Sequence, residues 1–284
     1  NRTLMKTIGF IDYYIDEWHA NNYPRLIKEI CKDTGRDFCV KYVWTEEDLP
    51  PQGGKSTDEW CIDHGCEKCE TIEELCEKSD YILILSPSNP EKHIKYAERA
   101  LKYKKNTYID KTFAPDYTEA EKIFDIAGKY RTRIFSSSAL RYADELDGFA
   151  GVKSIITTGG GGNLPEYIIH QIEMAQKVLA EKPLAVKVEK QGIQYICSTA
   201  FKNGKKSCMI YSPSMPFTAC GETADGRDIF KAIDSDYFKN LMADILRFYE
   251  TGEPSFDALQ TLDVMRVRTG VINALDSPGE YITL

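Results

Sequence analysis

One stretch of the chain, residues 81–141, limits the possible folds more than any other. The run Tyr81–Leu85 is apolar without interruption, which is typical of a strand covered on both faces in a parallel sheet. A helix is predicted to begin near Pro90, and short strands are predicted at 107–109 and 133–135 with a second helix between them. This alternation with short connections predicts an α/β fold built on a Rossmann-like, doubly wound parallel sheet.

The ends of these predicted strands carry polar side chains. Ser86 follows the first strand, Asp110 and Lys111 follow the second, and Ser138 lies just beyond the third. Ligands of doubly wound sheets bind at the carboxyl ends of the strands. We therefore expect the functional site at this edge of the sheet.

The turn after the first predicted strand, 7–11, is unusual for this class of fold. A dinucleotide-binding turn carries Gly-x-Gly-x-x-Gly, so that the backbone can approach a pyrophosphate resting on the N-terminus of the next helix. The chain has bulky side chains and three carboxylates instead, from Asp12 to Glu17, and the next helix is predicted from Pro24 to Cys31. Weak or absent dinucleotide binding is expected, and this turn could serve another contact, such as a subunit interface.

The periodicity changes after Arg141. A glycine loop at 159–162, which we interpret as a close-approach loop beside a ligand, precedes a helix predicted from Pro165 to Leu179. The stretches rich in β-branched and aromatic residues predict strands at 152–158, 186–188, 193–197 and 208–211, followed by two helices. The chain is therefore expected to form a Rossmann-like nucleotide-binding-type domain (1–140) and an α+β substrate and oligomerisation domain (141–284) with an open, mainly antiparallel sheet.

Composition excludes several classes of function. Apolar residues make up 42% of the 284 positions and charged residues 28%, and no apolar run approaches the length of a membrane span. A net charge of -8 without a basic cluster argues against a nucleic-acid partner. A small-molecule ligand and no membrane are expected. The N-terminus shows no secretory signal, and an odd number of cysteines, nine, suits free thiols in the cytoplasm.

Four cysteines and a histidine crowd the stretch 61–76 and raise the question of zinc. Their spacing matches no common zinc motif, and Thr71 followed by two glutamates predicts the first turn of a helix instead. The cysteines are then small apolar side chains of the interior. No metal site is expected. The residues concerned are Cys61, His64, Cys66, Cys69 and Cys76.

The order of these motifs resembles the Gfo/Idh/MocA oxidoreductases, the family of glucose-fructose oxidoreductase and inositol dehydrogenase. That family shows a strand ending in Thr-Pro, a histidine opening the next helix, and Glu-Lys-Pro after the following strand. Ser86-Pro87, His93 and Asp110-Lys111-Thr112 fill these places here, with the spacing from histidine to lysine kept. The resemblance resumes at Arg141, at the glycine loop with His170, and in residues 240–284.

The resemblance implies NAD(P)-dependent oxidation of a sugar, cyclitol or related polyhydroxy compound, and so a role in sugar metabolism. Lys111 would polarise the oxygen and His170 would accept the proton, because a desolvated lysine donates well and a histidine titrates near neutrality. Arg141 and Glu166 would contact the substrate, and the open sheet of the second domain would form a homo-oligomer. The implied cofactor contacts are Ile11, Asp12, Tyr13, Glu46, Ser86, Pro87, Asn89, His93 and Asp110.

Two other functions remain open. A non-catalytic ligand-binding protein of the same fold would explain the missing glycine turn. An NAD-dependent enzyme that cleaves glycosides through transient oxidation is the other alternative. The lost glycines favour a binding protein, whereas the retained Lys111 and His170 favour an enzyme; each of these two side chains could also be purely structural.

Overall fold

The structure is a computed structural model that describes residues 5–284. The chain forms two compact units. The first contains the chain up to Ser136 together with Met242–Ala258, and the second contains Ser137–Leu241 and Leu259–Leu284. The expected division into residues 1–140 and 141–284 took no account of the return of 242–258 to the first unit.

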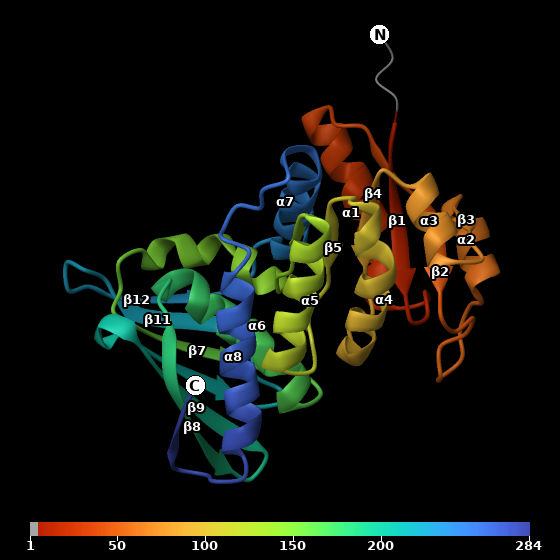
Figure 1. The fold of residues 1–284 in the computed structure, drawn as a ribbon. Coiled ribbons are helices and arrows are strands. Elements are labelled where there is room, and N and C mark those ends of the chain that lie inside the picture. The colour runs from red at the N-terminus through yellow and green to blue at the C-terminus, as the bar shows by residue number, and fades with distance from the viewer. Residues whose placement is uncertain (1–4) are drawn as a thin grey trace. The chain divides into compact units, whose positions relative to one another are not determined.

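The first unit is built on a parallel sheet of six strands in the order β3-β2-β1-β4-β5-β6 (Figure 1). This is the strand order of a Rossmann fold, with the change of direction between β1 and β4. The predicted doubly wound sheet is therefore confirmed. Its strands are β1 (Lys6–Asp12), β2 (Phe38–Thr45), β3 (Glu67–Lys68), β4 (Tyr81–Ile84), β5 (Thr107–Ile109) and β6 (Ile134–Phe135).

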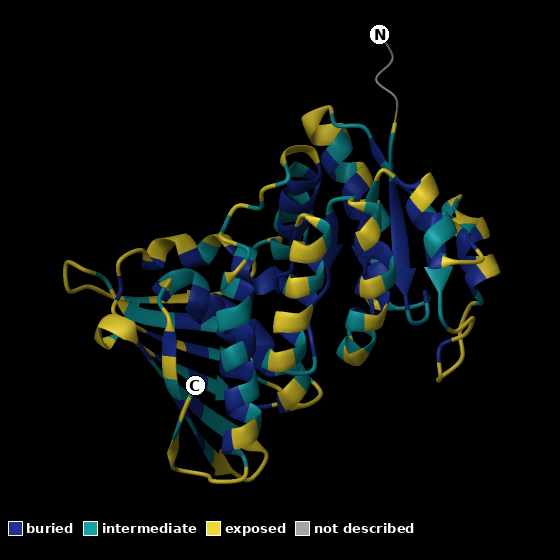
Figure 2. Ribbon diagram, in the orientation of Figure 1, coloured by how far each residue is buried: buried dark blue, intermediate teal, exposed yellow. Residues whose placement is uncertain are grey.

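Helices connect these strands, and the strands themselves lie in the interior. Figure 2 shows β1 buried and exposed residues along the outer sides of α4 and α5, as expected when helices cover a sheet. The helices are α1 (Trp18–Thr34), α2 (Thr57–His64), α3 (Ile72–Lys78), α4 (His93–Ala100) and α5 (Tyr117–Tyr130), with short 3-10 turns η1 (Pro90–Lys92) and η2 (Leu101–Tyr103).

Helix α1 begins earlier than the sequence pattern predicted. Pro24 lies inside the helix, and the first helical residue is Trp18. Two backbone N–H groups of the first turn, those of His19 and Ala20, donate to the side chain of Glu17, which therefore starts the helix in place of a first-turn proline. The prediction of a start at Pro24 was wrong, and the correction moves His19 from a loop onto the helix.

Residues 242–258 are held in the first unit by aromatic packing and hydrogen bonds. They include the end of α7 (Tyr237–Thr251). The hydroxyl group of Tyr249 donates to the backbone oxygen of Ile82 at 2.8 Å, and the side chain of Asn106 donates to the backbone oxygen of Tyr249 at 3.1 Å. The ring of Phe248 packs edge-on against Phe135. These contacts tie the segment to strands β4 and β6.

The second unit contains a seven-stranded mixed sheet in the order β12-β11-β7-β10-β9-β8-β13. Strands β7 and β10 run parallel and the other neighbours run antiparallel, so the expected mainly antiparallel sheet is confirmed. Three of the strands, β11, β12 and β13, were not anticipated. The strands are β7 (Ser154–Gly159), β8 (Pro183–Gln191), β9 (Gln194–Phe201), β10 (Lys206–Tyr211), β11 (Thr218–Glu222), β12 (Asp228–Ala232) and β13 (Tyr281–Thr283).

One face of this second sheet is covered and the other is open. Helix α6 (Leu164–Leu179) packs Met174 and Leu179 into a core that includes Ile155 of β7, and α8 (Gln260–Ala274) completes the helical layer. On the opposite face, Ile156 and Phe230 are 46% and 63% exposed. The 3-10 turns of this unit are η3 (Ala139–Tyr142), η4 (Asp144–Phe149) and η5 (Lys202–Gly204).

None of the helices in residues 5–284 has the length and apolar character needed to cross a bilayer.

Candidate functional site

A buried carboxyl group lies at the carboxyl end of β1. Oδ1 of Asp12 accepts hydrogen bonds from the backbone N–H groups of Tyr13 (2.7 Å) and Ser86 (2.9 Å), and the hydroxyl group of Ser86 lies 3.3 Å away. Burial raises the pKa of Asp12 to about 8. The ends of β1 and β4 are thus joined by a carboxyl group that is mostly protonated at neutral pH.

A second carboxyl group closes the N-terminus of α1. The side chain of Glu17 accepts from the backbone N–H groups of His19 (2.7 Å) and Ala20 (2.6 Å). Burial, followed by the nearby charge of Asp12, raises the pKa of Glu17 to about 8. The positive end of the α1 dipole therefore faces a side chain of this same protein.

His19 on α1 forms an ion pair with Asp110 at the end of β5. The Nδ1 atom of the ring contacts Oδ2 of the fully buried carboxylate, and the ring of Tyr23 stacks on the imidazole. Burial would by itself lower the pKa of His19, but the negative charge of Asp110 raises it above its ordinary value. Burial would by itself raise the pKa of Asp110, but the charge of His19 holds the pKa of this carboxylate below its usual range. The charged form of each group thus stabilises the charged form of the other.

Lys111 lies directly beside this pair. Its backbone N–H donates to Oδ1 of Asp110 at 2.9 Å, and the residue is only 9% exposed. The peptide bond between Lys111 and Thr112 is cis. One carboxylate, Asp110, thus positions both the ring of His19 and the backbone of Lys111 at the carboxyl ends of the strands.

The residues of the β1–α1 turn do not fit the pyrophosphate of a dinucleotide. In a Rossmann fold the pyrophosphate accepts hydrogen bonds from the N-terminus of this helix, next to glycines without side chains. Here the carboxylate oxygens of Glu17 already take the N–H groups of His19 and Ala20. The rings of Tyr13 and Tyr14 pack against one another in the turn. A pyrophosphate in the usual pose would have to displace Glu17.

Two residues predicted to contact a cofactor, Glu46 and His93, make close contacts within the protein. Glu46 accepts from the side chains of Lys92, Lys95 and Tyr96 at 2.9, 3.1 and 2.7 Å. Partial burial acts to raise its pKa, but these hydrogen bonds lower it to about 2. The ring of His93 lies between the backbone oxygens of Leu85 and Phe113, at 2.5 and 2.9 Å, and burial lowers its pKa. Glu46 therefore anchors α4, and His93 links the segment after β4 to the segment after Lys111.

The other residues predicted to contact a cofactor lie near the strand ends, but their side chains do not converge on one polar site. Ile11 is buried within β1, and the ring of Tyr13 lies under the ammonium group of Lys92 at 4.3 Å. Pro87 is half-buried. The side chain of Asn89 makes no capping hydrogen bond to the following turn and donates to Glu91 at 3.1 Å.

Polar side chains of the second unit form a buried network of their own. The hydroxyl group of Ser138 lies 2.6 Å from Nδ1 of His170, and its backbone N–H donates to Glu173 at 3.2 Å. Nε of Arg141 donates to the other oxygen of Glu173 at 2.7 Å, and Arg141 also donates to Gln260 at 2.9 Å. The structure therefore brings the predicted residues Arg141 and His170 into one hydrogen-bonded network, through Ser138 and Glu173.

The start of α6 accounts for two other predicted features. The backbone N–H of Glu166 donates to the side chain of Asn163 at 2.9 Å, and Asn163 donates back to the Glu166 carboxylate at 3.2 Å. A side chain at Gly160 would lie within 2.6 Å of the backbone oxygen of Ser212. Glycine is thus required in this loop because the loop passes close to the backbone of the same chain. The interpretation of the loop as lying beside a ligand did not include this reason.

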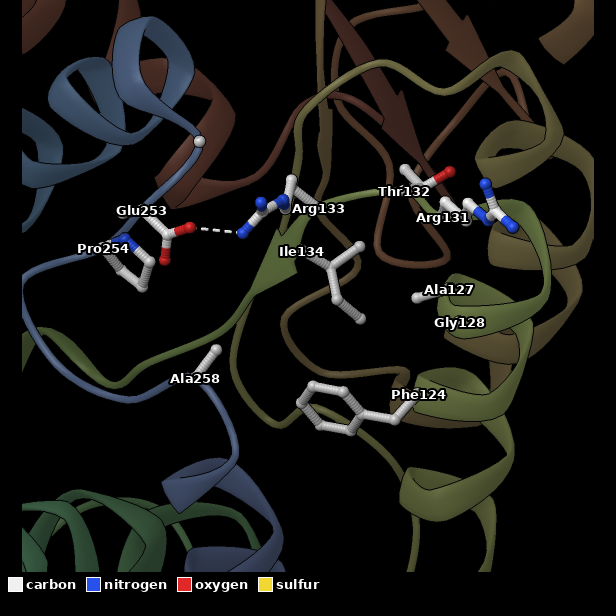
Figure 3. Close-up of a pocket in the computed structure, with 11 residues that line it drawn as sticks. Phe124, Ala127, Gly128, Arg131, Thr132, Arg133, Ile134, Glu253, Pro254 and Ala258 are labelled. Carbon is white, nitrogen blue, oxygen red and sulfur yellow. Dashed lines mark hydrogen bonds and ion pairs between the residues drawn. The ribbon is translucent and has the colours of Figure 1, made fainter.

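A depression of about 350 Å³ on the first unit lies away from the strand ends (Figure 3). It is lined by the end of α5, the residues that lead into β6, and the segment 252–258. Arg133 forms an ion pair with Glu253 at its rim. Because these residues precede β6, the depression lies at the amino end of that strand, opposite the edge where ligands of this fold bind.

The cysteine-rich stretch is explained by packing. Cys61, Cys69 and Cys76 are buried, and Thr71 caps α3 by accepting from the backbone N–H of Glu74 at 3.0 Å. All nine cysteines are free thiols. Within the described part of the chain, no group of three or more His, Cys, Asp or Glu side chains is arranged to hold a metal ion.

The sequence-based interpretation missed His19, Tyr23 and Glu173. His19 and Tyr23 lay in a predicted loop because glutamate is an uncommon N-cap residue and Pro24 resembles a helix start. The spacing of Ala20, Tyr23, Ile27 and Ile30, all of them buried, carried the helical period and could have placed both residues on α1. Glu173 had no local signal, because its partner Arg141 is distant in sequence.

Comparisons with known proteins agree with this architecture. Residues 52–138 match the GFO_IDH_MocA family, described as an oxidoreductase family with an NAD-binding Rossmann fold. A comparison with curated protein sequences finds no match.

Solved structures share the fold over almost the whole chain. A probable dehydrogenase from Thermotoga maritima is 14% identical with a TM-score of 0.78, covering 98% of each chain. A myo-inositol dehydrogenase from Corynebacterium glutamicum is 11% identical with a TM-score of 0.77, covering 99% of each chain. An aldose-aldose oxidoreductase from Caulobacter crescentus is 14% identical with a TM-score of 0.74, covering 98% of this chain and 100% of its own.

At these identities the structural likeness establishes the fold rather than the activity. The family match adds the part of the chain that carries Ser86, His93 and Asp110-Lys111. In residues 52–138 this chain is thus similar to the Gfo/Idh/MocA oxidoreductases, and it shares the fold of solved dehydrogenases over nearly all of its length.

Proposed function

We propose that this protein binds a small polyhydroxy compound, a sugar or a cyclitol, at the strand ends of its first unit, and that it does so without NAD(P) held at the β1–α1 turn. The observation that carries the proposal is the side chain of Glu17, which takes the helix N–H groups that a pyrophosphate needs. Asp12, Ser86 and Asp110 lie at neighbouring strand ends and supply the mixture of donors and acceptors that hydroxyl groups require. The solved relatives that are named as inositol and aldose enzymes support the ligand class.

Calorimetric titration of the full chain with NAD⁺, NADH, NADP⁺ and NADPH tests the cofactor part of this proposal. We expect no heat of binding up to about 1 mM dinucleotide, because binding would displace Glu17 from the N-terminus of α1. This corresponds to a binding free energy weaker than about -4 kcal/mol. Parallel titrations with myo-inositol, sorbitol and glucose test the ligand class. A dinucleotide dissociation constant in the micromolar range or below contradicts the proposal.

NAD(P)-dependent oxidation of a polyhydroxy compound is the second candidate function. The family match and the retained Lys111, nearly buried beside Asp110, favour it. In this alternative Lys111 donates a hydrogen bond to the reacting oxygen, and His170 accepts the hydroxyl proton. Arg141 and Glu166 would contact the substrate. Dinucleotide affinity in the titration above would favour this candidate over the first.

We also propose that the open face of the second sheet forms a homo-oligomer. Its centre is apolar, with Ile156, Cys208 and Phe230 on strands that lie in one sheet, and Ile156 and Phe230 are well exposed. A charged residue at the centre of an apolar interface is strongly unfavourable, so Ile156→Asp is expected to yield a monomer. Light scattering coupled to gel filtration measures this. Ile62→Asp, at an 80% exposed position on α2, is the control that should keep the wild-type mass; a monomeric wild type contradicts the proposal.

The nine free thiols support a reducing compartment, the cytoplasm, as the place where the protein works.

A further inference from the structure

Gly128 occupies a position in α5 where glycine is unfavourable and where packing within the chain does not require it. It lies inside the helix Tyr117–Tyr130, and its φ is not positive, so a residue with a side chain could adopt the same backbone conformation. A Cβ atom built at this position meets nothing within 4 Å. Glycine in a helix interior is destabilising relative to alanine, because it loses more conformational freedom on folding. The contacts of the chain itself therefore give no reason for this glycine.

Arg131 shows the reverse situation at the end of the same helix. Its backbone lies in the left-handed region, with φ 57° and ψ 39°, at a position where helices commonly have glycine and where a Cβ atom is strained. Its guanidinium group makes no hydrogen bond or ion pair with any residue in the range 5–284. An arginine at a strained position without an internal partner is explained if its side chain serves a partner outside the chain.

Both residues line the depression of about 350 Å³ described above. All of its lining residues belong to the first unit. Figure 3 shows the side chains of Phe124 and Ile134 between α5 and the segment 253–258, where they form an apolar floor. Gly128 leaves the wall on the side of α5 open, and Arg131 adds a charge at the end of that wall.

One positive charge of the depression is not balanced within it. Two arginines and one glutamate line the depression, and Arg133 is paired with Glu253, which leaves the guanidinium group of Arg131. A guanidinium group is planar and binds a carboxylate through two parallel hydrogen bonds. A volume of about 350 Å³ lies at the lower end of the range of small-molecule pockets, which combine an apolar lining with a few polar groups. These features suit a small molecule with one carboxylate and an apolar body.

We propose that this depression is a second ligand site, which binds a small monocarboxylate with an aliphatic or aromatic body. The carboxylate pairs with Arg131, and the apolar body packs on Phe124 and Ile134 beside Gly128. The site lies at the amino end of β6, opposite the strand ends, and so it is separate from the site of the proposed function and does not depend on it.

Matched acids and amides test the proposal in ligand-observed NMR titrations of the full chain at pH 7. Phenylacetate is compared with phenylacetamide, and hexanoate with hexanamide. Each acid is expected to bind about 10-fold or more tightly than its amide, because a hydrogen bond between two charged groups is the stronger kind. Acetate carries the charge without the body and is expected to bind about 10-fold or more weakly than hexanoate, because it buries fewer methylene groups.

Gly128→Ala is the most informative variant, because its effects on stability and on binding are expected to be opposite. Alanine favours the helix and the new methyl group meets nothing within the chain, so the unfolding midpoint should rise by about 2 °C. The same methyl group narrows the site and should weaken the binding of phenylacetate about 10-fold. Arg131→Gly removes the charge together with the strained backbone, so it should abolish the preference for acids without lowering the midpoint.

Two substitutions of the same kinds serve as controls. Gly148→Ala adds a methyl group at another exposed glycine with nothing within 4 Å, and Lys104→Gly removes a cation from another left-handed position, with φ 58°. Neither residue lines the depression, and both variants should keep the wild-type affinity for the acids.

Equal affinity for acids and amides overturns the proposal, and so does wild-type affinity in both Gly128→Ala and Arg131→Gly. A loss of affinity in Lys104→Gly as large as that in Arg131→Gly would indicate general charge attraction and also contradicts it. None of the probes carries the hydroxyl groups of a sugar or cyclitol, so these results leave the proposed function as it stands.

Discussion

Replacing Asp12 by asparagine is expected to stabilise the protein at pH 8 and to change its stability much less at pH 5. The pKa of Asp12 is raised by burial from 3.8 to about 8 in the folded state. Between these pH values the unfolded chain loses a proton that the folded chain keeps, so the free energy of unfolding falls as pH rises. The amide of asparagine retains the oxygen that accepts from Tyr13 and Ser86 but does not ionise.

The size of the stabilisation by Asp12→Asn follows from the size of the pKa shift of Asp12. A full shift of about four pKa units would correspond to an upper limit on the order of 5 kcal/mol at pH 8, because each unit is worth about 1.4 kcal/mol. An increase in the unfolding midpoint of roughly 5 °C or more at pH 8 is therefore expected in scanning calorimetry. At pH 5 the stabilisation by Asp12→Asn should be no more than about a third of its value at pH 8. The reason is that stability is lost only over the pH interval between the unfolded pKa of 3.8 and the pH of the measurement.

Asp16 in the same turn is the matched control, because the sign of its shift is opposite. The backbone N–H of Lys55 donates to Asp16 and lowers its pKa, so its charge stabilises the folded state above pH 4 and Asp16→Asn should lower the midpoint at pH 8. Equal destabilisation by Asp12→Asn at both pH values would mean that Asp12 is ionised in the folded protein.

Lys111→Ala is expected to lower turnover about 100-fold or more if the protein oxidises a polyhydroxy substrate. Loss of a group that assists proton transfer or polarises the reacting oxygen usually has an effect of this size. His170→Ala should act similarly, because the imidazole is the other candidate for the acid–base role and is held by Ser138. Steady-state kinetics measures kcat and KM for each variant. A fall in kcat without a matching rise in KM identifies loss of transition-state assistance rather than of ligand binding.

Two controls separate chemistry from folding in these variants. Lys32→Ala removes an exposed lysine from the last turn of α1, and His64→Ala removes a histidine from α2; neither lies at the strand ends. Both should keep wild-type turnover. If Lys111→Ala and His170→Ala lower turnover no more than these controls, the two residues are structural and the binding-protein function is favoured.

The class of the fold could be predicted from the sequence because its signal is local. The apolar run at β4 and the helical spacing of the segments that follow it identified the parallel sheet, and the loss of glycines between Asp12 and Glu17 was visible directly. Lys111 was placed correctly at the end of a strand for the same reason. These features depend on residues that are close together in the chain, where periodicity and turn chemistry operate.

The composition of the site was decided by contacts between residues that are far apart in sequence. Asp110 meets His19 across 91 positions, and Arg141 meets Glu173 across 32. The surroundings of Glu46, which was predicted to contact a cofactor, likewise depend on Lys92 of η1 and Lys95 of α4, both of which donate to its carboxylate. A side chain's partner, burial and pKa depend on which elements pack together, and local periodicity carries no information about this. Only the tertiary structure could show that Glu17 takes two N–H groups at the N-terminus of α1 and that a histidine lies beside the strand-end lysine.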